Sequence, residues 1–122
     1  MSQFEVIIKK AFSSAHALRH YHGATEPLHG HNYEVEVMAE SDELDERGFV
    51  VDFGELDDVK RWIDATLDHR HLNEVMEGQP SAEAIARLVH DWCRRELPSP
   101  VADRIAGVRV WETPKAYAEY RP

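Results

Sequence analysis

Residues 29–40 constrain the fold more than any other part of the chain, because apolar and polar side chains alternate along them. Alternation with a period of two predicts a β-strand with one face on a core. The run begins His29-Gly30-His31, and residues two apart in a strand point to the same face. The two imidazoles should therefore lie side by side, and they supply two of the three protein ligands that a catalytic zinc site usually has.

The alternation also divides the rest of this strand between two faces. We expect the core face to carry Tyr33, Val35, Val37 and Ala39. The opposite face then carries His31, Asn32, Glu36 and Met38. This division requires a bulge in the strand, because one extra residue shifts the side chains that follow to the other face.

His16 is the candidate for a third ligand. It follows a predicted strand that covers at least residues 4–10. If residues 17–28 are the loop of a hairpin, His16 returns beside His29 and His31, and the three imidazoles match a catalytic zinc site. Without a metal, the same residues would be ordinary packed or surface histidines.

The remaining segments complete a ββααββ order. They are a helix over 55–67, a helix that begins after Ser81 and ends before Pro98, and strands over 108–112 and 116–120. This order predicts an α+β fold in one domain, residues 1–122, in which two helices cover one face of a four-stranded antiparallel sheet. The exposed edge strands of so small a sheet favour pairing with other subunits into a larger barrel.

Composition excludes several classes of function. The formal net charge is −9 and no basic stripe offsets it, which argues against a nucleic-acid partner. No apolar run approaches ~20 residues, so we expect no membrane span. The first residues lack the pattern of a secretory signal, and a single cysteine favours the cytoplasm. The chain has 8 histidines, an excess that favours a metal site.

Two carboxylates beside polar neighbours are further candidates. Asp68 precedes His69 at the end of the first predicted helix, where it can orient the imidazole for proton transfer. The ordinary interpretation is a helix end at which the dipole favours histidine. Glu112-Thr113 ends the third predicted strand, and a carboxylate there can accept paired hydrogen bonds from a guanidine-like ring edge such as that of a pterin. Cys93 lies within the second predicted helix, where packing is a more natural role than nucleophilic catalysis.

Six segments together resemble the 6-pyruvoyltetrahydropterin synthase and 6-carboxytetrahydropterin synthase family. They are Phe12-Ser13-Ser14-Ala15-His16, Leu28-His29-Gly30-His31-Asn32-Tyr33, Gly48-Phe49-Val50-Val51-Asp52-Phe53, Leu67-Asp68-His69-Arg70-His71-Leu72-Asn73, Pro80-Ser81-Ala82-Glu83 and Val110-Trp111-Glu112-Thr113. The resemblance implies the tunnelling fold, in which subunits form homo-oligomers (trimers or hexamers) with active sites between them. It implies 7,8-dihydroneopterin triphosphate as substrate and Zn2+ bound by His16, His29 and His31.

The resemblance implies roles for three further residues, and at one position this chain departs from the family pattern. Glu112 matches the glutamate that anchors the pterin, while Asp68 and His69 match two members of a proton-transfer triad. The third member is a cysteine, but Thr25 stands at its position, and a threonine hydroxyl is far too weak an acid to replace a thiolate. The next residue, Glu26, resembles a branch of the family in which a glutamate three residues before His-Gly-His acts as the base.

Members of that branch cleave the substrate side chain to 6-hydroxymethyl-7,8-dihydropterin, which bypasses dihydroneopterin aldolase in folate synthesis. We therefore expect a zinc-dependent lyase with this product, in which Thr25 and Thr113 contact the substrate. The alternative products are 6-carboxy-5,6,7,8-tetrahydropterin, for the queuosine route, and 6-pyruvoyltetrahydropterin. An alternative of another class is a zinc- or pterin-binding module that lost catalysis together with the cysteine.

Overall fold

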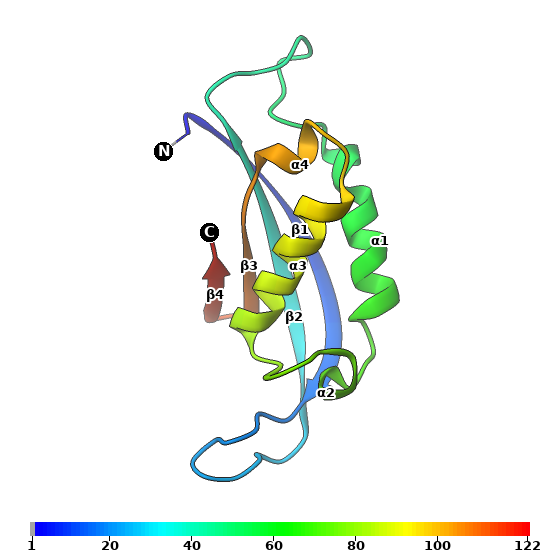
Figure 1. The fold of residues 1–122 in the computed structure, drawn as a ribbon, viewed down its shortest axis with the longest axis vertical. Helices are drawn as coiled ribbons and strands as arrows, with labels where there is room; N and C mark the ends of the chain where they lie inside the picture. Colours follow the sequence, from blue (N-terminus) through cyan, green and yellow to red (C-terminus); the bar gives the residue numbers. More distant parts are fainter. Residues whose placement is uncertain (1) are drawn as a thin grey trace.

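The computed structural model describes residues 2–122, which form an antiparallel sheet with helices packed on one face (Figure 1). The strands follow chain order in the sheet: β1 (Phe4–His16), β2 (His29–Ser41), β3 (Ile105–Thr113) and β4 (Ala116–Tyr120). The helices are η1 (Phe53–Leu56), α1 (Asp57–Thr66), α2 (Leu72–Val75), α3 (Ala82–Glu96) and α4 (Val101–Arg104). The predicted α+β architecture is confirmed, with α1 and α3 as the two long helices.

β1 and β2 form a long hairpin that places the candidate ligands. Their register is unbroken along both strands and ends with His16 opposite His29. Every second side chain of each strand points toward the helices. Among them, Tyr33 stacks on Phe12 with ring centroids 4.8 Å apart. The hairpin thus brings residues of two distant segments to one end of one sheet face.

The bulge predicted in this strand does not separate His31 from Tyr33, and placing His31 on the face opposite Tyr33 was wrong. His31 pairs with Ser14 and Tyr33 with Phe12, in an even register. Side chains two apart share a face, so His31 points to the helix side together with Tyr33. The register shift that β2 does have lies near its other end, opposite β3.

The hydrophobic core lies between the sheet and the two long helices. Its fully buried members include Val35, Val37, Val108 and Val110 from the strands, and Val59, Ile63, Ile85 and Val89 from the helices. Burying each such side chain contributes roughly 1.5–3 kcal/mol to folding. α3 begins after Ser81, as predicted, and the Oγ of Ser81 caps the helix by accepting the N–H of Ala84 at 3.2 Å.

The segment between α1 and α3 contains α2 and runs beside the end of β1. The N–H of His69 donates to the carbonyl of Ser13 at 2.6 Å, and the N–H of Ala15 donates to the carbonyl of Arg70 at 3.0 Å. The outer edge of β1 is therefore covered next to His16. Within residues 2–122, no helix is long and apolar enough to cross a membrane.

Candidate metal centre

The three predicted ligands converge where β1 ends and β2 begins. We call His16, His29 and His31 the histidine cluster. One ligand nitrogen from each residue lies within 4.8 Å of the other two. The ring centroids are 4.7 Å apart for His16 and His29, 4.8 Å for His29 and His31, and 5.1 Å for His16 and His31. The unbroken hairpin register produces this arrangement, because it sets His16 directly opposite His29.

Two of the rings are oriented by backbone carbonyls. The Nδ1–H of His16 donates to the carbonyl of Pro80 at 2.7 Å, and the Nδ1–H of His29 donates to the carbonyl of Pro27 at 2.9 Å. This tautomer leaves the Nε2 lone pair of each ring free for a metal. The two Nε2 atoms are 3.1 Å apart, so two acceptors face each other with no donor between them unless a proton or a cation binds there.

His31 completes the test of whether a metal fits. Its Nε2 is buried and has no hydrogen-bond partner among the described residues. Burial lowers the pKa of His31 below its ordinary value, and the neighbouring histidines lower it further against the opposing attraction of Glu112. The ring is therefore kept neutral, which is the form that binds metal. Three imidazoles whose ligand nitrogens converge in this way are a donor set suited to a divalent ion such as zinc.

Two predicted functional carboxylates border the histidine cluster. The Oε1 of Glu112 lies 3.5 Å from the Nε2 of His16 and 3.9 Å from the Nε2 of His31. The Oε1 of Glu26 lies 3.8 Å from the Nε2 of His29. Both carboxylates can therefore reach a molecule that contacts a metal bound by the cluster.

Glu26 rather than Thr25 faces the cluster. The Glu26 side chain is 16% exposed, and its Oε1 accepts the N–H of Leu18 at 2.9 Å. Thr25 is exposed on the loop between β1 and β2. Thr25, which matches the family's cysteine position in the resemblance, is therefore exposed in this chain. The carboxylate of the adjacent Glu26 lies beside the histidine cluster instead.

Asp68 and His69 pair with each other and do not join the histidine cluster of their own chain. The Nδ1–H of His69 donates to Oδ2 of Asp68 at 2.8 Å, and the N–H of Ser13 donates to Oδ1 at 2.9 Å. The Ser13 hydrogen bond, followed by that of His69, holds the pKa of Asp68 below its ordinary value. His69 has a φ of 56°, which lets adjacent side chains meet, and its ring is 82% exposed. Within residues 2–122, neither side chain makes a polar contact with the cluster.

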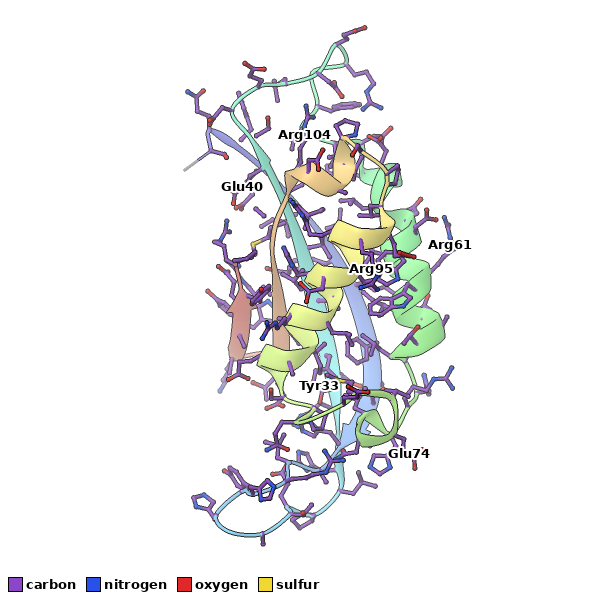
Figure 2. All side chains as sticks on the ribbon, viewed as in Figure 1. Tyr33, Glu40, Arg61, Glu74, Arg95 and Arg104 are labelled. Carbon is purple, nitrogen blue, oxygen red and sulfur yellow. The ribbon has the colours of Figure 1, made fainter. Side chains whose placement is uncertain are left out.

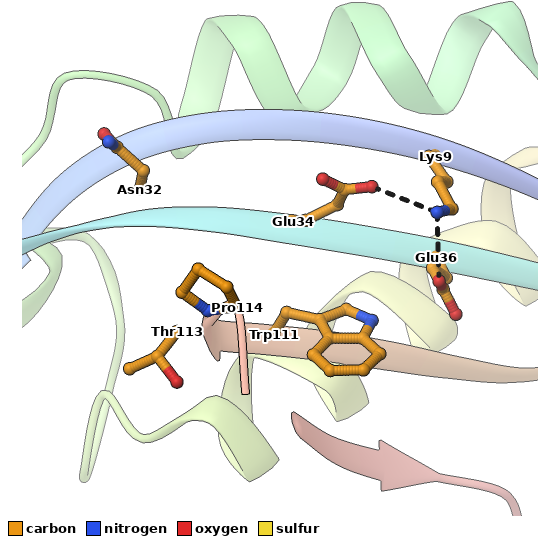
Figure 3. Close-up of a pocket in the computed structure, with 7 residues that line it drawn as sticks. All are labelled: Lys9, Asn32, Glu34, Glu36, Trp111, Thr113 and Pro114. Carbon is orange, nitrogen blue, oxygen red and sulfur yellow. Dashed lines mark ion pairs between the residues drawn. The ribbon is translucent and has the colours of Figure 1, made fainter. Parts of the chain in front are cut away.

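Thr113 lies on the other face of the sheet from its neighbour Glu112, because successive strand residues point to opposite faces. It lines a hollow of about 350 Å³ on the helix-free face, together with Trp111 and Lys9 (Figure 3). Lys9 pairs there with Glu34 at 3.6 Å. The structure therefore does not bring Thr113 to the histidine cluster of its own chain.

Tyr33 is a residue of the site that sequence analysis assigned only to the core. Figure 2 shows Tyr33 toward the lower end of the sheet. Its side chain is 1% exposed, and its hydroxyl lies 3.2 Å from the Nδ1 of His16. Burial raises the pKa of Tyr33, and the nearby Glu112 and Glu26 raise it further, so the hydroxyl keeps its proton. The signal available in the sequence was its position two residues after His31, on the same face of the strand.

Comparison with known proteins agrees with this arrangement. A family model described as 6-pyruvoyl tetrahydropterin synthase matches residues 5–122. The chain belongs to this family. As a member of the 6-pyruvoyl tetrahydropterin synthase family, it is related to enzymes that act on pterins, and the resemblance inferred from the six sequence segments is confirmed.

Named relatives differ in the reaction recorded for them. The dihydroneopterin monophosphate aldolase of Pyrococcus furiosus is 34% identical over 107 residues, 88% of this chain and 88% of its own length. The 6-carboxy-5,6,7,8-tetrahydropterin synthase of Bacillus subtilis is 32% identical over 129 residues, 98% of this chain and 86% of its own length. The structure of Caenorhabditis elegans 6-pyruvoyl tetrahydropterin synthase superposes with a TM-score of 0.78 at 23% identity, covering 100% of this chain and 99% of that chain. The tunnelling fold is therefore confirmed.

Proposed function

We propose that this chain is a zinc-dependent lyase that cleaves the side chain of a dihydroneopterin phosphate ester to give 6-hydroxymethyl-7,8-dihydropterin. The observation that carries the proposal is the carboxylate of Glu26, whose Oε1 lies 3.8 Å from the Nε2 of His29 while Thr25 is exposed. The name of the Pyrococcus relative, an aldolase of dihydroneopterin monophosphate, supports the same reaction.

The reaction is a retro-aldol cleavage in which Glu26 is the base. Glu26 takes the proton of the hydroxyl on the second side-chain carbon, and the bond between the first and second carbons breaks. The second carbon becomes the carbonyl of a glycolaldehyde phosphate ester. The electron pair passes to the first carbon and the conjugated pterin ring, and the first carbon then takes a proton to become the hydroxymethyl group.

The other residues bind the substrate and deliver the proton. Glu112 accepts hydrogen bonds from the guanidine-like edge of the pterin ring. Asp68 orients His69, which supplies the proton to the first side-chain carbon. Zn2+ held by the histidine cluster would polarise the side-chain hydroxyl oxygens and so make the proton easier to remove.

Because the Asp68–His69 pair makes no polar contact with the cluster of its own chain among residues 2–122, we propose that a neighbouring subunit supplies it in a trimer or hexamer. Exposed apolar side chains support such an assembly. Phe4, Leu44, Phe49 and Phe53, which are 41–63% exposed, surround a hollow of about 370 Å³. Light scattering tests the subunit number, and a monomer would contradict this part of the proposal.

Mixing two inactive variants tests the shared site. Each variant, Glu26→Gln or His69→Ala, lacks one catalytic side chain. In a mixed oligomer, some sites receive Glu26 from one subunit and His69 from its neighbour, so those sites are complete. Random mixing at equal amounts should restore about one quarter of the wild-type rate. No recovery after subunit exchange would show that each site is built within one chain.

The second candidate function is a 6-carboxy-5,6,7,8-tetrahydropterin synthase, which the Bacillus relative favours by its name. In the family pattern this activity uses a thiol base, and burial raises the pKa of Cys93, the single cysteine, to about 12. Chromatographic product analysis on dihydroneopterin triphosphate and monophosphate separates the candidates. Hydroxymethyl pterin supports the lyase, carboxytetrahydropterin overturns it, and metal and pterin binding without turnover indicates a non-catalytic module.

A further inference from the structure

Two amide side chains hold the segment that follows His16. The Oδ1 of Asn73 accepts the N–H of Ala17 at 2.9 Å, and its Nδ2 donates to the carbonyl of Ala17 at 2.7 Å. Gln79 repeats the arrangement with Arg19: its Oε1 accepts the N–H at 2.7 Å, and its Nε2 donates to the carbonyl. Paired residues of an antiparallel sheet exchange both backbone hydrogen bonds in the same way. The two amides therefore replace a neighbouring strand along this segment.

Leu18, the residue between the two clamped positions, makes the backbone hydrogen bonds that hold Glu26. Leu18 points its backbone groups to the opposite edge from its neighbours, as alternate residues of an extended chain do. Its N–H donates to the Oε1 of Glu26 at 2.9 Å, and its carbonyl accepts the N–H of Glu26 at 3.0 Å. The same Oε1 is the atom 3.8 Å from His29. The place of this carboxylate thus depends on the backbone of Leu18, whose two neighbours, Ala17 and Arg19, are each held by an amide side chain.

The clamps are needed because the sheet itself ends here. β1 stops at His16, and the next backbone pair beyond Leu18 and Glu26, between Tyr21 and Ala24, lies in the loop. Gln79 is adjacent to Pro80, whose carbonyl accepts the Nδ1–H of His16. One segment therefore orients both a ring of the histidine cluster and the backbone that holds the carboxylate.

We propose that Asn73 and Gln79 are positioning residues, which hold the Glu26 carboxylate at the histidine cluster through the backbone of residues 17–19. This role rests on the proposed function, in which Glu26 removes the substrate proton. Outer contacts that orient the groups of a metal site typically contribute about 10–100-fold in activity. A displacement of about 1 Å at a reacting group can cost about 100-fold in rate.

Asn73→Asp and Gln79→Glu test the clamps with nearly isosteric changes. Each keeps the oxygen that accepts the backbone N–H and replaces the donor nitrogen by an oxygen that faces a carbonyl. Gln3→Glu, exposed just before β1, adds the same charge away from the site and serves as the control. The first measurement is amide hydrogen exchange of Leu18 by NMR in the zinc-loaded protein. Exchange should be at least about tenfold faster in both clamp variants and unchanged in the control.

The second measurement is steady-state kinetics with the same variants. The kcat should fall about 10–100-fold in Asn73→Asp, with KM within about twofold and zinc content unchanged. In a Glu26→Gln background, Asn73→Asp should cause no further loss, because both changes act on one group.

Several results overturn this proposal. One is an unchanged hydrogen-exchange rate at Leu18 in the clamp variants, and another is a wild-type kcat in clamp variants that fold. A third is a loss of kcat from Asn73→Asp in the Glu26→Gln background as large as its loss in the wild-type background. If Glu26→Gln alone retains wild-type turnover, the proposed base is wrong and the positioning role fails with it. If Glu26→Gln is inactive but the exchange of Leu18 does not change, only the clamp proposal fails.

Discussion

Metal binding should stabilise the folded chain, and replacing His31 by alanine should remove most of that gain. The three ligand nitrogens of the histidine cluster lie within 4.8 Å of one another only once the hairpin has formed. The Nε2 of His31 is buried without a hydrogen-bond partner among the described residues. A metal that binds the native state and not the unfolded chain shifts the folding equilibrium by mass action.

The size of the effect follows from the free metal concentration. At a free zinc concentration about 1,000 times Kd, binding adds about 4.1 kcal/mol to the free energy of unfolding. For a domain of this length, about 1 kcal/mol moves Tm by about 3–5 °C, so the expected rise is about 12–20 °C. If losing the third imidazole weakens binding about 100-fold, the same free zinc adds only about 1.4 kcal/mol, or about 4–7 °C.

Scanning calorimetry in metal-buffered solution, with and without zinc, measures these shifts. His71→Ala is the matched control, because that histidine lies outside the cluster and pairs with Glu74 at 3.4 Å. It should keep the full wild-type shift. A wild-type shift below about 3 °C, or an equal loss in His71→Ala and His31→Ala, would refute the assignment of the metal centre.

Two further predictions concern Asp68 and Cys93. The pKa of Asp68 is lowered by the Ser13 amide and by His69, so its ionised form stabilises the fold above about pH 4, and this stabilisation is lost as the pH falls through the folded-state pKa. Asp68→Asn should therefore flatten the acid decline in the free energy of unfolding measured by urea titration, and an unchanged decline would contradict the hydrogen bonds assigned to Asp68. Burial raises the pKa of Cys93 to about 12, so only about one thiol in 10⁴ is ionised at pH 8. A chromogenic disulfide reagent should label it at least about 100-fold more slowly in the native than in the unfolded protein, and rapid native labelling would show a reactive thiol.

The parts of the structure that sequence could predict depend on local periodicity. Alternation over residues 29–40 predicted β2, and the hairpin with β1 predicted that His16 would meet His29 and His31. The face assigned to His31 was wrong because it required a bulge between His31 and Tyr33, and the register with β1 has none there. In the structure, the unbroken register places the His31 ring on the helix side, on the same face of β2 as Tyr33 and the core residues that follow it.

The parts that sequence could not predict depend on contacts between distant segments. The carbonyl of Pro80 orients His16 across 64 positions of the chain, and any residue type could have supplied that carbonyl. The clamps of Asn73 and Gln79 join residues 56 and 60 positions apart. Such contacts are set by the path of the segment between α1 and α3, which has no periodic pattern of its own.

Turnover of Glu26→Gln and Thr25→Ala on dihydroneopterin monophosphate and triphosphate, with zinc content measured alongside, tests the central claim most directly. The position of the Glu26 carboxylate, 3.8 Å from the Nε2 of His29, predicts that Glu26→Gln loses at least about 100-fold in hydroxymethyl pterin formation while it still binds zinc. Thr25→Ala, at an exposed residue, should stay within about threefold of wild type. Full activity in Glu26→Gln, or loss of activity only in Thr25→Ala, would contradict the assignment of Glu26 as the base.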